Sequence, residues 1–197
     1  MREPAGFFET LPFGNILVKK ITDKLHYYSK KYDYQNVLLS PIQSKRLMKT
    51  SGRMDQFSND VIGLDIYNGK FILSPTHEEY LTELLKKTLD SYRKLPMILY
   101  QINEVYRNKR HKSSHGILRA SQIPVYGAYC ITKDEKELFN IGDEFNEIFK
   151  QFYESMNIPL IKLNRKERFT DYLYLTKEGL EVVPICKNRH LTQNSQK

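Results

Sequence analysis

Two apolar segments on either side of a basic loop constrain the fold more than any other feature of this chain. Residues 95–106 (LPMILYQINEVY) alternate in polarity as a β-strand does, which puts four side chains on one face: Ile98, Tyr100, Ile102 and Tyr106. Residues 116–130 (GILRASQIPVYGAYC) return as a second strand after the basic loop of residues 107–115. The pattern predicts a long β-hairpin, with Arg107 at the last position of the outgoing strand and Arg119 on the returning one.

A second hairpin and a helix are predicted upstream. Residues 64–73 (LDIYNGKFIL) place two apolar runs around Asn68-Gly69, the dipeptide favoured in a two-residue type I′ turn. Thr76 and Glu79 then fit a capping box, and a helical leucine stripe follows: Leu81, Leu84, Leu85 and Leu89. This reading of the helix start leaves His77 and Glu78 unexplained.

The rest of the chain adds helices around these strands. Helical spacing covers residues 14–28 and 43–50, and a capping box from Thr132 to Glu135 opens a helix with an apolar stripe: Leu138, Phe145, Phe149, Phe152 and Met156. Short strands are predicted at residues 36–41, 158–163, 171–175 and 180–185. Hairpins with long flanking helices indicate an α+β domain around a largely antiparallel sheet.

Composition narrows the function classes. The 197 residues suffice for one sizeable domain, and a formal charge of +8 favours a polyanionic partner such as RNA, although a solvated basic surface is the alternative. Cys130 and Cys186 are far apart, which suits a reducing compartment, and Cys186 with His190 provides too few ligands for a metal site. No apolar run has the length of a membrane span, and the N-terminus lacks the pattern of a signal peptide or presequence.

The arginines of the long hairpin are the first candidates for chemistry. Arg107 and Arg119, on adjacent strands, could grip phosphate groups through paired hydrogen bonds. The alternative is an ordinary solvated loop, which most charge runs are.

Four stretches together resemble a known family. They are GFFETLPFGNILVKKI (6–21), SGRMDQF (51–57), SPTHEEYLTELLKKTLDSYRKLP (74–96) and LYQINEVYRNKRHKSSHGILRAS (99–121). In this order they resemble the catalytic core of a class II aminoacyl-tRNA synthetase, most similar to prolyl-tRNA synthetase of the bacterial and organellar type. The first is similar to motif 1, which Pro41 closes, and the last to motif 2, with Tyr106-Arg107 at the family's Phe-Arg.

The resemblance implies an antiparallel sheet flanked by helices and a specific reaction. Such enzymes activate proline with ATP and Mg²⁺ and transfer the prolyl group to tRNA(Pro). Carried over, Thr76 and Glu78 would hold the proline imino group, Arg107 would bind the α-phosphate and the carboxylate, and Arg119 would assist in the ATP site. Pro41 and the helix before it would form a homodimer interface. The resemblance implies no resident metal and no membrane association.

The chain also departs from the family pattern. Lys109, or Asn108 if the loop shifts, stands where motif 2 has a glutamate that contacts adenine. Gln122 replaces another glutamate, and Thr132 replaces a histidine. Tyr126-Gly127 replaces a Lys-Asp pair. A lysine cannot accept the hydrogen bond that the adenine amino group offers.

The resemblance covers residues 1–163 as the synthetase core, and 164–197 as a remnant or the start of an inserted region with a polar tail. The glycine-rich motif 3 and the anticodon-binding domain have no counterpart, so the core is incomplete and the chain alone is not expected to form an adenylate efficiently. One interpretation is a prolyl-tRNA synthetase or a fragment of one. The other is an inactive RNA-binding or accessory subunit, for example in an organellar ribosome or polymerase. A mitochondrion or plastid is the expected compartment, or the cytoplasm in a bacterium.

Overall fold

The computed structural model describes residues 6–108, 116–117, 119–164 and 170–174. The chain divides into two compact units, residues 1–143 and 144–197. The elements of the first unit run in this order: α1 (Pro12–Lys31), β1 (Gln35–Asn36), β2 (Ile42–Ser44), α2 (Lys45–Thr50), β3 (Ile62–Leu64), the 3₁₀ turn η1 (Tyr67–Gly69), β4 (Phe71–Leu73), α3 (Glu78–Thr88), η2 (Tyr92–Lys94), β5 (Met97–Tyr106) and β6 (Gln122–Ile131). Helix α4 (Glu135–Glu154) passes from the first unit into the second, which contains β7 (Ile161–Asn164) and β8 (Thr170–Leu173).

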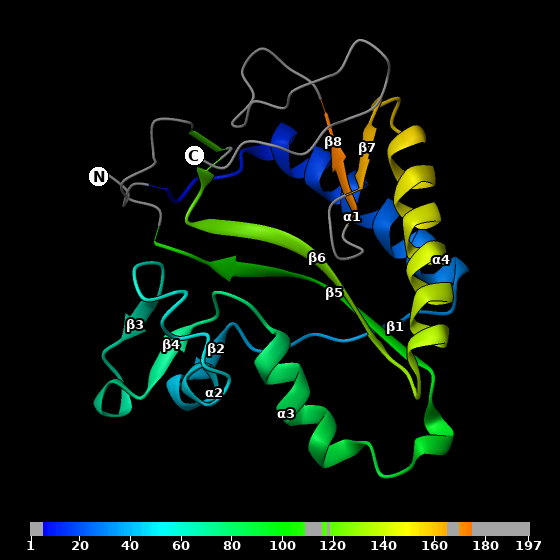
Figure 1. The fold of residues 1–197 in the computed structure, drawn as a ribbon. Coiled ribbons are helices and arrows are strands. Elements are labelled where there is room, and N and C mark those ends of the chain that lie inside the picture. The colour runs from blue at the N-terminus through cyan, green and yellow to red at the C-terminus, as the bar shows by residue number, and fades with distance from the viewer. Residues whose placement is uncertain (1–5, 109–115, 118, 165–169, 175–197) are drawn as a thin grey trace. The chain divides into compact units, whose positions relative to one another are not determined.

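The predicted long hairpin is the centre of the first unit and is confirmed (Figure 1). Strands β5 and β6 pair antiparallel over their full length, from Met97 opposite Ile131 to Tyr106 opposite Gln122. Strand β1 adds to the other edge of β5 in parallel orientation, so the sheet is largely, not entirely, antiparallel. Both arginine positions differ from the prediction. Arg107 follows β5 instead of being its last residue, and Arg119 precedes β6 instead of lying on it.

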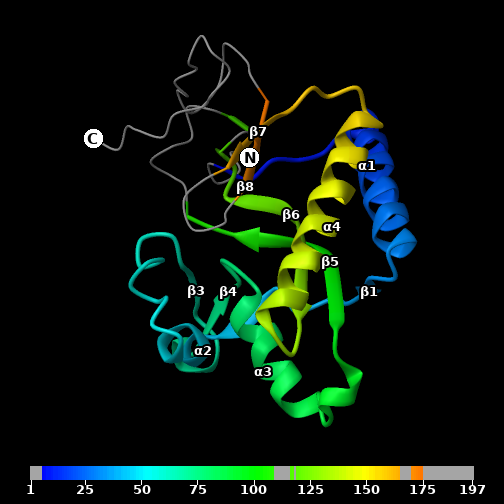
Figure 2. The same cartoon turned by 45° about the vertical axis from the view of Figure 1, so that its right-hand side comes forward.

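The two faces of this sheet receive different helices (Figures 1 and 2). On the face of Tyr100 and Tyr126, helix α1 is fixed by polar contacts: His26 Nδ1 lies 2.9 Å from the Tyr100 hydroxyl, and Ser29 Oγ lies 2.8 Å from the Tyr126 hydroxyl. On the opposite face, Leu81 of α3 packs in one buried cluster with Leu99. Because side chains alternate along a strand, the even positions of β5 face α1 and the odd positions face α3.

The upstream hairpin forms, but its turn differs from the prediction. Strands β3 and β4 pair antiparallel, with Ile62 opposite Leu73 and Leu64 opposite Phe71, and β2 pairs with the other edge of β4. The connection is longer than two residues and contains η1, where Tyr67, Asn68 and Gly69 all have positive φ. Asn and Gly tolerate positive φ, so the dipeptide correctly predicts the position of the turn. The predicted two-residue type I′ turn is wrong.

Gly6, at the start of the described chain, lies so close to Ser121 that only glycine fits. Gly6 has φ +92° and its carbonyl accepts a hydrogen bond of 2.6 Å from the Ser121 backbone N–H. A Cβ at this position would collide with the Ser121 side chain, so the glycine lets the N-terminal segment lie against the residue that precedes β6.

The second unit contains the end of α4 and a two-stranded sheet. The apolar stripe predicted for α4 is correct in part: Phe152 is buried and the rings of Phe145 and Phe149 are 4.8 Å apart, but Leu138 is 43% exposed and the buried Ile148 was not predicted. Strands β7 and β8 pair antiparallel, so the strands expected at 158–163 and 171–175 both exist with shifted bounds. The strand expected at 180–185 and the pair Cys186 and His190 lie outside the described residues.

Candidate functional site

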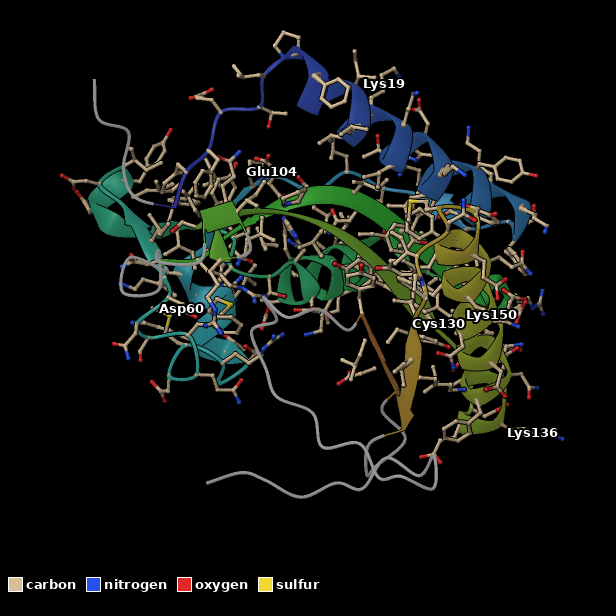
Figure 3. All side chains as sticks on the ribbon, turned by 90° about the horizontal axis from the view of Figure 1, so that it is seen from above. Lys19, Asp60, Glu104, Cys130, Lys136 and Lys150 are labelled. Atoms are coloured by element: carbon tan, nitrogen blue, oxygen red, sulfur yellow. The ribbon has the colours of Figure 1, made fainter. Side chains whose placement is uncertain are left out.

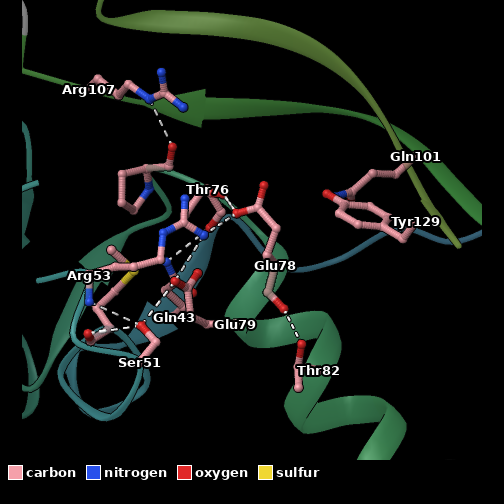
Figure 4. Close-up of polar contacts among 12 residues, drawn as sticks. Gln43, Ser51, Arg53, Thr76, Glu78, Glu79, Thr82, Gln101, Arg107 and Tyr129 are labelled. Carbon is pink, nitrogen blue, oxygen red and sulfur yellow. Dashed lines mark hydrogen bonds and ion pairs between the residues drawn. The ribbon is translucent and has the colours of Figure 1, made fainter. Parts of the chain in front are cut away.

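The candidate site lies where three segments of the first unit meet: the turn of residues 51–60, the link from β4 into α3, and the end of β5 (Figure 4). Backbone carbonyls of the link accept hydrogen bonds from both sides. The Pro75 oxygen accepts from Arg107 Nε at 3.0 Å, and the Thr76 oxygen accepts from Gln43 Nε2 at 3.1 Å. The link is thereby fixed between β2 and the end of β5.

Two adjacent carboxylates open helix α3, and one arginine binds both. Arg53 Nη1 lies 2.8 Å from Glu78 Oε2 and 3.2 Å from Glu79 Oε1. The Glu79 side chain is 6% exposed and also accepts a 3.1 Å hydrogen bond from Ser51 Oγ, whereas that of Glu78 is 53% exposed. Burial acts to lower the pKa of Arg53, but the hydrogen bonds and charges of both glutamates outweigh it and raise that pKa. Glu79 is therefore held inside the protein through Oε1, while its Oε2 is buried without a hydrogen-bond partner among the described residues. Glu78 is half-exposed and accessible to a ligand.

The predicted capping box is wrong. Helix α3 begins at Glu78 with His77 as its N-cap, and no side chain caps it. The buried Thr76 hydroxyl instead donates to Glu78 Oε2. Thr76 and Glu78, the two residues predicted to hold an imino group, are therefore in direct contact.

Arg107, the predicted phosphate ligand, follows β5 directly. Its guanidinium carbon lies 5.4 Å from the centroid of the Phe57 ring, the same distance as that of Arg53. Since its bond to Pro75 uses Nε, the two terminal nitrogens of Arg107 remain available for an anion within the described structure.

Arg119 has an unsatisfied donor. Its Nε is buried and has no hydrogen-bond acceptor among the described residues. A buried N–H without a partner costs about 1–3 kcal/mol, so an anionic ligand at this position would relieve a real penalty. No described contact joins Arg119 to the cluster of Arg53 and Glu78.

His77, which the sequence left unexplained, is buried beside the acids. Its side chain is 3% exposed and Nε2 has no partner among the described residues. Burial lowers the pKa of His77 from its ordinary 6.5, against the opposing charge of Glu78. The imidazole is therefore neutral at pH 7.

Gln101 and Tyr129 lie on the sheet near Glu78 (Figure 4). Gln101 Nε2 donates to the Tyr129 hydroxyl at 3.0 Å, and its Oε1 accepts from the Leu39 backbone N–H at 3.4 Å. The pKa of Tyr129 is raised overall. Burial is the main cause and the charge of Glu78 adds to it, while the hydrogen bond from Gln101 acts in the opposite direction. A Cβ at Gly127 would come within 2.9 Å of this hydroxyl, so the glycine that departs from the family pattern gives the Tyr129 ring its room.

The other departures have structural partners. Gln122 Nε2 donates to Glu104 at 2.5 Å, and the Tyr106 hydroxyl donates to the same carboxylate at 2.8 Å. Burial and then the Glu104 carboxylate raise the pKa of Tyr106 to about 12. Glu104, Tyr106 and Gln122 project from the sheet face that carries α1. Figure 3 labels Glu104.

Three further departures complete the comparison with the family pattern. Tyr126 bonds to Ser29 of α1, and the Thr132 hydroxyl donates to the Asp134 carbonyl at 3.0 Å. Lys109 lies outside the described residues, while the neighbouring Asn108 N–H donates to the Asp60 carbonyl at 2.8 Å.

Pro41, the residue predicted at a dimer interface, is exposed and lies between β1 and β2. Its carbonyl accepts a 2.8 Å hydrogen bond from the Ser74 N–H, which joins this segment to the start of the site. Its role in an interface stays a prediction.

The described part of the chain contains no cluster of three or more His, Cys, Asp or Glu side chains placed to bind a metal ion. None of its helices combines the length and the apolarity needed to cross a bilayer.

Sequence reasoning missed Arg53 and Gln101 as members of the site. Arg53 was visible only as part of a family motif, and Gln101 as a polar residue at a strand position expected to be buried. A buried glutamine in an apolar strand is the signal that could have singled out Gln101, because such an amide needs hydrogen-bond partners.

The fold and the motifs of this site define a class of protein. Residues 63–194 match the family described as "tRNA synthetase class II core domain (G, H, P, S and T)", and the chain belongs to this family.

Curated relatives narrow the resemblance within the family and confirm its similarity to prolyl-tRNA synthetase. The proline–tRNA ligase of Thermotoga sp. (strain RQ2) is 34% identical over 150 residues, 76% of this chain and 25% of that protein. The proline–tRNA ligase of Syntrophomonas wolfei is 29% identical over 201 aligned positions, 98% of this chain and 35% of that protein. The chain thus spans about a quarter to a third of the length of these relatives.

Solved structures confirm the fold. The Giardia lamblia prolyl-tRNA synthetase in complex with prolyl-adenylate has a TM-score of 0.75 at 16% identity, covering 82% of this chain and 34% of that one. The histidyl-tRNA synthetase from Nostoc sp. PCC 7120 has a TM-score of 0.67 at 18% identity, covering 82% of this chain and 36% of that one. The predicted α+β, class II synthetase-like architecture is therefore correct.

Proposed function

We propose that this chain is the part of a prolyl-tRNA synthetase that binds proline and the α-phosphate of ATP, for transfer of the prolyl group to tRNA(Pro). The observation that carries the proposal is the contact of Thr76 with Glu78 beside Arg53 and Arg107. An amino acid is a zwitterion, and this group offers it a carboxylate and guanidinium donors within one site. The names of the curated relatives support proline as the amino acid.

In this proposal the residues of the chain act by positioning and by charge. Glu78 pairs with the secondary ammonium of proline, because burying that cation without a partner would be costly. Arg107 binds the proline carboxylate and the α-phosphate, and stabilises the charge that develops as the carboxylate attacks phosphorus. Arg119, with its unsatisfied Nε, contributes to the ATP site. ATP enters as its Mg²⁺ complex, as a substrate.

A homodimer through α1 belongs to the same proposal. Six large apolar side chains at and after the start of this helix are 42–74% exposed: Leu11, Phe13, Ile16, Leu17, Val18 and Ile21. An apolar surface of this kind favours association. We also propose a mitochondrion or plastid as the compartment, or the cytoplasm in a bacterium.

Calorimetric titration of proline tests the amino-acid site. Glu78→Gln is expected to weaken proline binding about 10- to 100-fold, because a hydrogen bond to a charged group contributes about 1.5–3 kcal/mol. Glu83→Gln on the same helix is the matched control, since Glu83 pairs with Arg46 and Lys87 instead. Unchanged affinity in Glu78→Gln would refute the role of Glu78.

Exchange of pyrophosphate into ATP tests catalysis. The full gene product is expected to catalyse proline-dependent exchange. Absence of exchange, together with RNA binding and no proline affinity, would favour the second candidate, an accessory RNA-binding subunit. One observation favours that candidate. Gln122, which replaces a glutamate of the family pattern, forms a hydrogen bond with Glu104 on the sheet face that carries α1.

A further inference from the structure

Arg53 belongs to the site, but the proposed function assigns it no role. It lies in the turn of residues 51–60, and its Nη1 contacts both carboxylates at the start of α3, at 2.8 Å and 3.2 Å. One cation facing two carboxylates leaves one negative charge uncompensated. The cluster of Arg53, Glu78 and Glu79 therefore suits a ligand with a single positive charge.

The contacts on Glu78 are one-sided. Arg53 and the Thr76 hydroxyl both donate to Oε2, and no described group donates to Oε1 (Figure 4). A half-exposed glutamate at the start of a helix would otherwise sample several rotamers. Two donors on one oxygen hold the carboxylate in one orientation and leave the other oxygen open.

Arg53 is itself held in place. Its guanidinium lies over the Phe57 ring at 5.4 Å, and its side chain is only 32% exposed. Ser51 accepts from the Arg53 backbone N–H at 3.4 Å and donates to Glu79 at 3.1 Å, which ties the turn to α3. The planar guanidinium can stack and bond to carboxylates at once, which a lysine cannot do equally well.

We infer that Arg53 is a positioning residue: it orients the Glu78 carboxylate for a cationic amine, while Glu79 and Phe57 hold Arg53. The inference rests on the proposed function, since the amine is that of the amino-acid substrate. Arg53 need not touch the substrate, because it acts through Glu78.

Affinities for proline and for ATP with Mg²⁺, measured separately by calorimetry, test this role. Arg53→Gln is expected to weaken proline binding about tenfold and to leave ATP binding within about twofold. Arg53→Lys keeps the charge and should recover part of the loss.

Arg46→Gln is the matched control. Arg46 also pairs with a carboxylate of α3, Glu83, at 3.8 Å, but its side chain is 67% exposed and outside the cluster. Its loss should leave both affinities unchanged.

Any one of the following results would overturn the inference. Proline affinity unchanged in Arg53→Gln would do so, as would an equal loss of proline and ATP affinity, which indicates a merely structural role. If Arg53→Gln does not fold, Arg53→Lys decides, and wild-type proline affinity in that variant overturns the inference. Failure of the wild type to bind proline would overturn the proposed function as well, whereas sensitivity to Glu78→Gln without sensitivity to Arg53 would overturn this inference alone.

Discussion

Gln101→Leu should destabilise the first unit through hydrogen bonding, with little change of side-chain volume. Gln101 is 2% exposed, and its amide donates to the Tyr129 hydroxyl at 3.0 Å and accepts from the buried Leu39 N–H at 3.4 Å. Leucine removes these two bonds and a third, which Oε1 accepts from Asn103 Nδ2 at 3.3 Å. Asn103 Nδ2 keeps its bond to the Leu39 carbonyl, so the main cost is about 1–3 kcal/mol each for the Tyr129 hydroxyl and the Leu39 N–H. The additional apolar burial returns at most about 2 kcal/mol. We expect a net loss of about 2 kcal/mol in the free energy of unfolding.

Urea unfolding followed by far-ultraviolet circular dichroism measures this loss, since the chain contains no tryptophan for fluorescence. The midpoint should fall while the slope with urea stays constant. Gln56→Leu, at an exposed position of the turn of residues 51–60, is the control and should change stability by less than about 0.5 kcal/mol. Wild-type stability in Gln101→Leu would show that the amide network is not needed and would refute the reasoning.

Two further predictions follow from the shifted pKa values. Because the pKa of His77 is lower in the folded state than its ordinary 6.5, the unfolded state binds more protons just below that pH, and stability should fall as the pH decreases through 6.5 toward the folded-state pKa. Urea midpoints measured against pH should show this fall and should show a weaker one in His77→Gln; equal falls would contradict it. Tyr106, with a pKa of about 12, should titrate closer to 10 in Glu104→Gln. Carbon NMR of tyrosine labelled at Cζ measures both values, and an unchanged pKa would show that Glu104 does not cause the shift.

Some of the site residues could be predicted from the sequence. Thr76, Glu78 and Arg107 were singled out through the family resemblance, and the structure gathers them around Pro75 and Arg53. Their roles in binding stay predictions. The local pattern alone misjudged Thr76, because a capping box and a Thr–Glu contact use the same residue types at nearly the same spacing.

Elements whose signal is local can be predicted from neighbouring residues alone. The alternation of polarity along residues 97–106 depends only on neighbouring residues. The return of an apolar segment after a basic loop was enough to predict the antiparallel pairing that β5 and β6 form. The order of the motifs was likewise enough to indicate the synthetase core, which the family match confirms.

The partners of the polar groups, in contrast, depend on how the chain packs. Arg53 and Glu78 are 25 residues apart, and nothing between them indicates that one guanidinium will bind Glu78 and Glu79 together. The burial of His77 and the room that Gly127 gives Tyr129 depend in the same way on how segments pack. Secondary structure follows from periodicity along the chain, whereas a charge or a donor finds its partner through space, across segments that the fold brings together.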